Sequence, residues 1–205
     1  MIRRKMRFFL ILKGIGLLAL SSFWSKPKHL EPRELINWIE NPENGLKKTR
    51  EFNNILFSVQ QKTPEYIALK EEGLEPNEKL KFQSFIQSLG SLEYYTLTLE
   101  HKEGLNLLKN YSDNNEAYSK IFNYFSFKVQ EDLFLVSQAD TLPCLIIHSE
   151  RNYGLSPALK IHAAFQKPKD FSPREFIFYD KNFGAGKLKF LFQNNDPSTY
   201  PKLKE

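Results

Sequence analysis

The last third of the chain consists almost entirely of segments that resemble short strands, and this feature constrains the fold most. From Asp132 to Gln193, runs of alternating apolar and polar residues are separated by short turn-like segments. Alternation with a period of two is typical of strands with one buried face. Successive strands joined by short connections pair antiparallel. We therefore expect a mainly antiparallel sheet of about six or seven strands.

The first part of the chain mixes strand patterns with helical ones. Residues 53–61 and 91–101 are predicted strands, whereas residues 77–89 and 114–125 carry apolar side chains at the three- and four-residue spacing of a helix. The patterns together predict an α+β domain in which about three amphipathic helices cover the sheet. The helix over residues 77–89 should lie on the sheet through Phe82, Phe85, Ile86 and Leu89.

The chain begins with the layout of a secretory signal. A basic cluster ends at Arg7, an apolar run follows it, and Ala19 and Ser21 are small residues two positions apart. This order of basic, apolar and small residues is typical of a signal peptide. The apolar run is shorter than the roughly 20 residues of a membrane span. Lys13 interrupts it as well.

We therefore interpret residues 1–21 as a signal peptide or an N-terminal anchor, with an amphipathic or buried helix of a soluble protein as the third interpretation. Residues 22–32 contain Ser, Lys and Pro with little apolar content and are predicted to be a tether. Residues 33–205 are predicted to form a single α+β domain. The protein should be exported to the periplasm or cell envelope, either released or attached to the membrane through its N-terminal segment.

The charge balance argues against a nucleic-acid partner. The chain has 29 basic and 24 acidic residues, and five of the basic residues but none of the acidic ones precede Ser22. Removal of the leader therefore leaves as many basic as acidic residues. A nucleic-acid-binding protein needs a lasting positive excess to displace counterions from phosphates. We expect an envelope protein or a small ligand as the partner instead.

Five segments of the chain carry a resemblance to a known group of proteins: NPENGLKK, KTPEYIALKEE, DTLPCLIIHSERNYGLSP, YDKNFGAGKLKFLF and DPSTYPKLK. They are similar to segments of uncharacterised exported proteins of Bacteroidota, and the resemblance extends over roughly residues 35–205. Members of this group are often lipoproteins whose signal ends in a cysteine, whereas this chain has Ser21 and Ser22 there. The resemblance implies export and the fold class, and no activity.

Two histidines and a carboxylate form the sharpest candidate for a metal site. His148 and Glu150 are two positions apart and therefore share one face of a predicted strand. If residues 151–157 reverse the chain, His162 lies opposite His148 on the next strand. Two imidazoles and a carboxylate can hold Zn²⁺ with one position open. A metal-assisted envelope hydrolase is therefore the alternative function, and a polar face of the sheet is the simpler interpretation.

The loop after this strand is the predicted binding segment, because loops carry function more often than cores do. It places an acid, a base, an amide and a phenol between two apolar strands, in Glu150, Arg151, Asn152 and Tyr153. A salt-bridged turn is the other interpretation of these residues.

Catalytic chemistry has little support in the sequence. Cys144 is the only cysteine, so no intrachain disulfide can form. Four residues along a strand separate it from His148 by roughly 13 Å, too far for a nucleophile and its base. We find no catalytic residues and no cofactor motif. The sequence therefore favours a non-catalytic binding or scaffolding domain.

Overall fold

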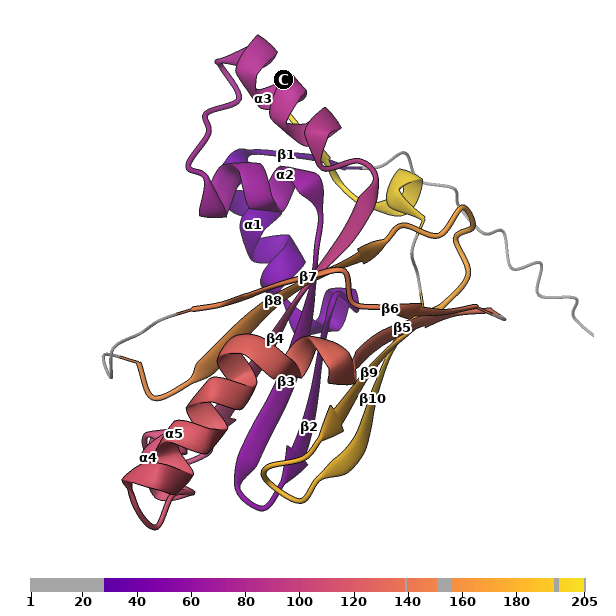
Figure 1. Ribbon diagram of the computed structural model, residues 1–205. Coiled ribbons are helices and arrows are strands. Elements are labelled where there is room, and N and C mark those ends of the chain that lie inside the picture. Colours follow the sequence, from indigo (N-terminus) through magenta and orange to yellow (C-terminus); the bar gives the residue numbers. More distant parts are fainter. Residues whose placement is uncertain (1–27, 139, 151–155, 194–195, 205) are drawn as a thin grey trace, which may run out of the picture.

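The protein folds around two antiparallel β-sheets that face each other across a shared core (Figure 1). The computed structural model describes residues 28–138, 140–150, 156–193 and 196–204. One sheet has five strands in the order β2-β3-β4-β8-β7, and the other has four in the order β10-β9-β5-β6. A short parallel pair, β1 with β11, brings together segments from opposite ends of the chain.

The strands have the following bounds: β1 (His29–Leu30), β2 (Lys47–Phe52), β3 (Ile55–Lys62), β4 (Leu92–His101), β5 (Leu133–Ser137), β6 (Asp140–Pro143), β7 (Ile146–Ser149), β8 (Leu159–Gln166), β9 (Arg174–Asp180), β10 (Gly186–Phe192) and β11 (Lys202–Leu203). The helices and helical turns are α1 (Pro32–Glu40), η1 (Pro42–Asn44), α2 (Pro64–Tyr66), η2 (Ile67–Glu71), α3 (Lys79–Ser88), α4 (Leu107–Asn110), α5 (Asn115–Asn123), η3 (Tyr124–Lys128), η4 (Val129–Asp132) and η5 (Pro197–Thr199).

Aromatic side chains fill the space between the two sheets. The rings of Tyr95 and Phe176, one from each sheet, lie 5.4 Å apart, and those of Phe57 and Phe178 lie 6.3 Å apart. The inward positions of β4 are those that the alternation predicts, because Tyr95, Leu97 and Leu99 are buried. Large aromatic residues stabilise such a core through the apolar area that they remove from water.

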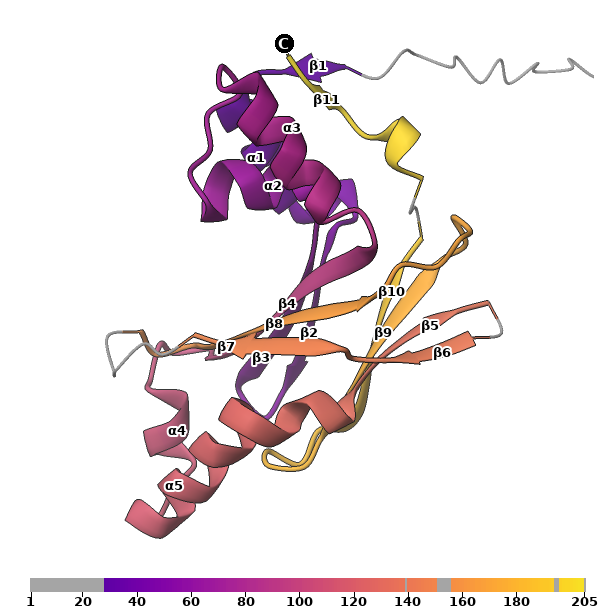
Figure 2. The ribbon, with the colours of Figure 1, turned by 45° about the horizontal axis from the view of Figure 1, so that its top comes forward.

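Helices close the structure at two opposite ends (Figure 2). At one end, α4, α5 and η3 contribute Leu107, Ile121 and Phe125 to the core between the sheets. At the other end, α1, α2 and η2 gather with the β1–β11 pair around a second, smaller cluster, and α3 contacts η2. The buried members of this cluster are Leu30, Leu35, Ile39, Leu46 and Tyr66.

The fold class is α+β, but the predicted single sheet of six or seven strands is wrong. The segment from 132 to 150 contains three strands, and the chain leaves the four-stranded sheet after β6 and enters the five-stranded sheet with β7. Pro143 is the last residue of β6, and the N–H of Cys144 then donates to the carbonyl of Leu133. Alternation identifies strands, but it does not identify the sheet that each strand joins.

The predicted position of α3 is also wrong. Phe82 is buried, whereas Phe85, Ile86 and Leu89 are only half-buried. The helix contacts η2 and lies with α1 and α2, away from the two sheets (Figure 2). The periodicity correctly predicts a helix with one apolar side, but Phe82 and Ile86 of that side line a pocket instead of packing on the sheet.

The folded domain begins a few residues earlier than the predicted boundary at residue 33. His29 and Leu30 form β1, which pairs with Lys202 and Leu203, and Leu30 is buried. These residues were predicted to belong to the tether. The predicted leader, residues 1–21, lies outside the described residues.

Candidate functional site

The three predicted metal-site residues lie together on the outer face of the five-stranded sheet. His148 is the register partner of His162, and their rings stack with centroids 5.9 Å apart. Glu150 follows β7, where its N–H donates to the carbonyl of Lys160 and continues the pairing. Oε1 of Glu150 consequently lies 2.9 Å from Nε2 of His162. The strand register predicted from the sequence is therefore confirmed.

Two further side chains bind the other ring nitrogen of His162. Its Nδ1 lies 2.8 Å from Nζ of Lys62 and 3.0 Å from Oγ1 of Thr96. Because the ammonium can only donate, Nδ1 accepts and the ring proton lies on Nε2, which donates to Glu150. Lys62 also forms an ion pair with Glu71 of η2. We call Lys62, Glu71, Thr96, Glu150 and His162 the polar network.

The polar network determines the protonation of its own members. Burial lowers the pKa of His162, and the charge of Lys62 lowers it further. Burial also lowers the pKa of Lys62, which the hydrogen bond and charge of Glu71 oppose. For Glu150, burial acts to raise the pKa, but the hydrogen bond from His162 and the charge of Lys160 outweigh it and hold the pKa below its usual value. The most consistent state is a charged lysine beside a neutral imidazole.

The site residues predicted from the sequence did not include Lys62, Glu71 or Thr96. Thr96 is the register partner of His162, and Lys62 is the last residue of β3. In the alternation along 91–101, Thr96 falls on the face opposite Tyr95 and Leu97, and this was the available signal. Of the predicted binding loop, only Glu150 is described, since Arg151, Asn152 and Tyr153 lie outside the described residues.

Cys144 has the environment of a core residue. It is buried in the cluster between the sheets, whereas His148 is exposed. Its Sγ donates to the carbonyl of Ile146 at 3.2 Å, and burial raises the pKa of the thiol to about 11. A nucleophilic cysteine requires a lowered pKa, so this environment opposes catalysis.

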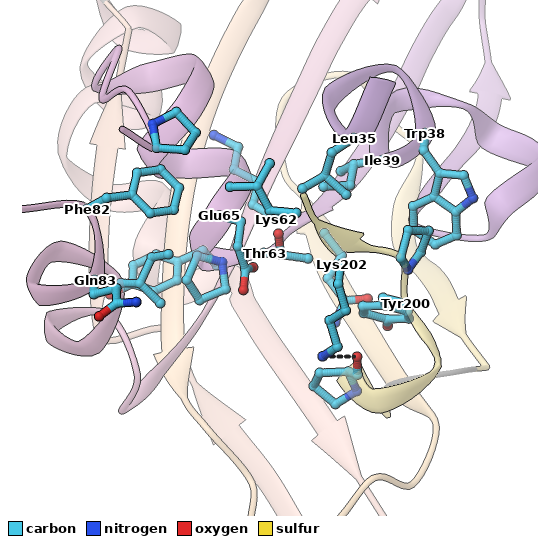
Figure 3. Close-up of a pocket in the computed structure, with 18 of the residues that line it drawn as sticks. Leu35, Trp38, Ile39, Lys62, Thr63, Glu65, Phe82, Gln83, Tyr200 and Lys202 are labelled. Carbon is cyan, nitrogen blue, oxygen red and sulfur yellow. Dashed lines mark hydrogen bonds between the residues drawn. The ribbon is translucent and has the colours of Figure 1, made fainter. Parts of the chain in front are cut away.

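A pocket of about 720 Å³ lies at the end of the structure that carries α1 and α3 (Figure 3). Its walls come from parts of the chain that are far apart in the sequence: α1, the turn from β3 into α2, α3, the beginning of β4, and the segment from η5 to β11. The apolar lining is formed by Leu35, Trp38, Ile39, Pro64, Pro76, Phe82, Ile86, Leu92, Tyr94, Pro197, Tyr200, Pro201 and Leu203.

Local sequence explains how α1 builds one wall of the pocket. Glu31 and Glu34 form a capping box, and Pro32 occupies the first turn, where its missing N–H costs nothing. Leu35 and Ile39 lie four residues apart on the buried side of the helix. Trp38 lies beside them and contacts Tyr200, with ring centroids 5.8 Å apart. The contact links α1 to the C-terminal segment.

The turn into α2 separates the pocket from the polar network. The side-chain oxygen of Thr63 accepts from the N–H of Tyr66, so Thr63 is the N-cap of α2. Glu65 lines the pocket between α3 and the C-terminal segment (Figure 3), whereas Glu71 at the end of η2 binds Lys62. Lys62 also lines the pocket, so the two features share a wall.

Charged groups of both signs line the pocket. Glu93 lies 3.4 Å from Nε of the buried Arg174; burial raises the pKa of Glu93 and the charge of Arg174 opposes this. Glu65 is half-buried and forms no hydrogen bond or ion pair with the other described residues. The lysines that line the pocket besides Lys62 are all exposed, namely Lys79, Lys167, Lys202 and Lys204.

Comparisons with known proteins identify no family for this chain. No family model and no curated protein matches it. Among solved structures, it is similar to a novel protein of unknown function from Burkholderia pseudomallei, with 12% identity over 83% of this chain and 92% of that chain. The TM-score is 0.35, and a similarity at this level does not transfer a function.

Within the described residues, no helix is both long enough and apolar enough to cross a membrane. In the same part of the chain, no group of three or more His, Cys, Asp or Glu side chains has an arrangement that would hold a metal ion.

Proposed function

We propose that this protein is an exported cell-envelope protein whose domain binds a small amphipathic molecule without catalysing a reaction. The observation that carries the proposal is the pocket of about 720 Å³ between α1, α3 and the C-terminal segment. Small-molecule sites are typically clefts of about 300–1,000 Å³ with mostly apolar walls and a few polar groups. The pocket has this size and this lining.

The construction of the pocket supports a binding role. The strand pair β1–β11 and the contact between Trp38 and Tyr200 fix the C-terminal wall of the pocket to the part of the chain around α1. The side chains that line it include Ile86 and Leu203, which are only half-buried and so leave apolar surface exposed. Burial of such surface by a ligand is favourable at about 25 cal/mol per Å².

Export is supported by the sequence of the leader. Residues 1–21 combine a basic cluster, an apolar run and the small residues Ala19 and Ser21. The described fold begins at β1, so cleavage after Ser21 would leave every described element intact. A retained leader would instead attach the same domain to the membrane.

A second candidate is a metal-assisted hydrolase that uses His148, Glu150 and His162. Its support is that these side chains do meet, with Glu150 2.9 Å from His162. The contacts of His162 oppose it, since both ring nitrogens are hydrogen-bonded and the Lys62 ammonium lies next to Nδ1. A cation at this place would meet a like charge. One equivalent of zinc by elemental analysis, lost in both His148→Ala and His162→Ala, would favour the hydrolase.

Binding is tested with Nile red, an uncharged dye whose fluorescence rises in apolar sites. The protein purified from its native host should bind the dye, and Gln83→Trp should abolish binding because Gln83 lines the pocket. Gln87→Trp is the matched control, since Gln87 is exposed on the same helix and does not line the pocket. Equal binding by both variants, or no binding by the unmodified protein, would contradict the proposal.

A further inference from the structure

The geometry points to a ligand class: a single-chain amphiphile with an anionic head group, such as a long-chain carboxylate. The inference rests on the proposed function and deepens it, because it specifies what the pocket binds. The inference follows from the apolar lining of the pocket, from the charged side chains around it and from the basic charge of residues 1–21.

The apolar part of the pocket suits an alkyl chain. Leu35 and Ile39 of α1 lie across the pocket from Phe82 of α3 (Figure 3), and Ile86 and Leu92 add to the lining. These side chains cannot form hydrogen bonds. A ligand with polar groups along its length would therefore lose its hydrogen bonds to water on entering the pocket. An alkyl chain loses none, and each methylene that it buries raises affinity by about fourfold.

The positively charged groups suit an anionic head. Lys79, Lys167 and Lys202 come from three separate segments and line the same pocket. Within the described part of the chain, Lys79 and Lys167 form no ion pair, and Lys202 donates to the backbone carbonyl of Pro197 at 3.3 Å. An ammonium group without an acidic partner can donate to a carboxylate or phosphate.

The acidic groups of the pocket do not balance these lysines. The acids that line it are Glu65 and Glu93, and Glu93 is already paired with Arg174 and also lies within reach of the charge of Lys167. Basic side chains therefore outnumber acidic ones around the pocket, and complementarity favours an anion. The same charge disfavours the leader of this chain as the occupant, because five basic residues and no acidic residue precede Ser22.

The experiment compares three ligands that share a ten-carbon chain and differ in head group: decanoate, decanol and decyltrimethylammonium. Each displaces Nile red from the protein purified from its native host, below its micelle-forming concentration. Decanoate should bind at least about fivefold more tightly than decanol, as expected for one solvent-screened charge contact. This preference should shrink as salt is added, because salt screens exposed charges.

Charge reversal then locates the head group. Lys167→Glu should remove the preference for decanoate while Nile red still binds. Lys169→Glu is the matched control, since Lys169 is exposed on the same segment and does not line the pocket. Thermal unfolding of both variants establishes that each is folded.

Each result has a distinct meaning. A preference for decanoate that Lys167→Glu removes and Lys169→Glu retains supports the inference. Equal binding of decanol, or a preference for the cationic ligand, overturns the inference and leaves the proposed function standing. If neither Nile red nor any of the three ligands binds, the inference and the proposed function are both wrong.

Discussion

The ammonium nitrogen of Lys62 lies 2.8 Å from Nδ1 of His162, so two groups that can each carry a positive charge are in direct contact. The contact is favourable only while the imidazole is neutral, because a protonated Nδ1 would present a second donor and a like charge. Glu71 binds the ammonium and Glu150 accepts from Nε2. The fold therefore stabilises one protonation state of His162.

The stability of the protein should consequently fall as the pH drops below about 6.5. The pKa of His162 is lowered in the fold from 6.5, so the unfolded chain binds a proton at a higher pH than the folded one. The stabilisation is fully present above the unfolded pKa and is lost as the pH falls toward the folded pKa. Urea unfolding at about pH 8 and about pH 5.5 measures the loss. His162→Asn should flatten this dependence, and an unchanged slope in that variant would show that another group is responsible.

Removal of the Lys62 charge should destabilise the protein. Its side chain is 5% exposed and bonds Glu71 and His162, so Lys62→Met should lower the free energy of unfolding by about 1.5–3 kcal/mol. Lys160→Met is the control, because Lys160 is exposed and lies 3.4 Å from Glu150; it should cost less than about 1 kcal/mol. Chemical denaturation of both variants gives the two values. Similar losses would argue against a special role for the buried lysine.

Arg174 should be one of the most sensitive positions in the chain. Its side chain is 1% exposed, and it binds Glu93, Asp170 and the hydroxyl of Ser137. Arg174→Met leaves buried acceptors without their donor, so it should cost about 3–5 kcal/mol. Arg50→Met, at an exposed position on β2, should stay within about 0.5 kcal/mol. Thermal unfolding of both variants measures the loss of stability. A small loss in Arg174→Met would mean that water molecules replace the guanidinium as donors to its partners.

The protein from its native host should have its N-terminus near Ser22 and lie outside the cytoplasmic membrane. The small residues Ala19 and Ser21 provide the expected cleavage site. Intact-mass measurement of the fractionated protein tests both statements. A soluble cytosolic form that retains Met1 would contradict export, and a membrane-bound form that retains it would identify an anchor.

Several features of the fold could be predicted because they depend on neighbours in the sequence. The alternation of Tyr95, Leu97 and Leu99 marks the buried face of β4, and Thr63 before Pro64 marks a helix start. The pairing of His148 with His162 followed in the same way, because a single chain reversal determines the register of two adjacent strands.

The features that could not be predicted depend on contacts between segments far apart in the sequence. Periodicity shows that α3 has an apolar side around Phe82, but any apolar surface would satisfy that pattern. The pairing of Leu30 with Leu203 joins the two ends of the chain and forms one wall of the pocket, and two-residue strands leave no periodic signal. In the sequence, Lys62 is an ordinary polar residue beside a predicted strand, and only the fold places Glu71 and His162 next to it. The sequence by itself therefore determined which faces are apolar. The tertiary structure alone decided what covers them, because burial and charge pairing arise only when distant segments meet.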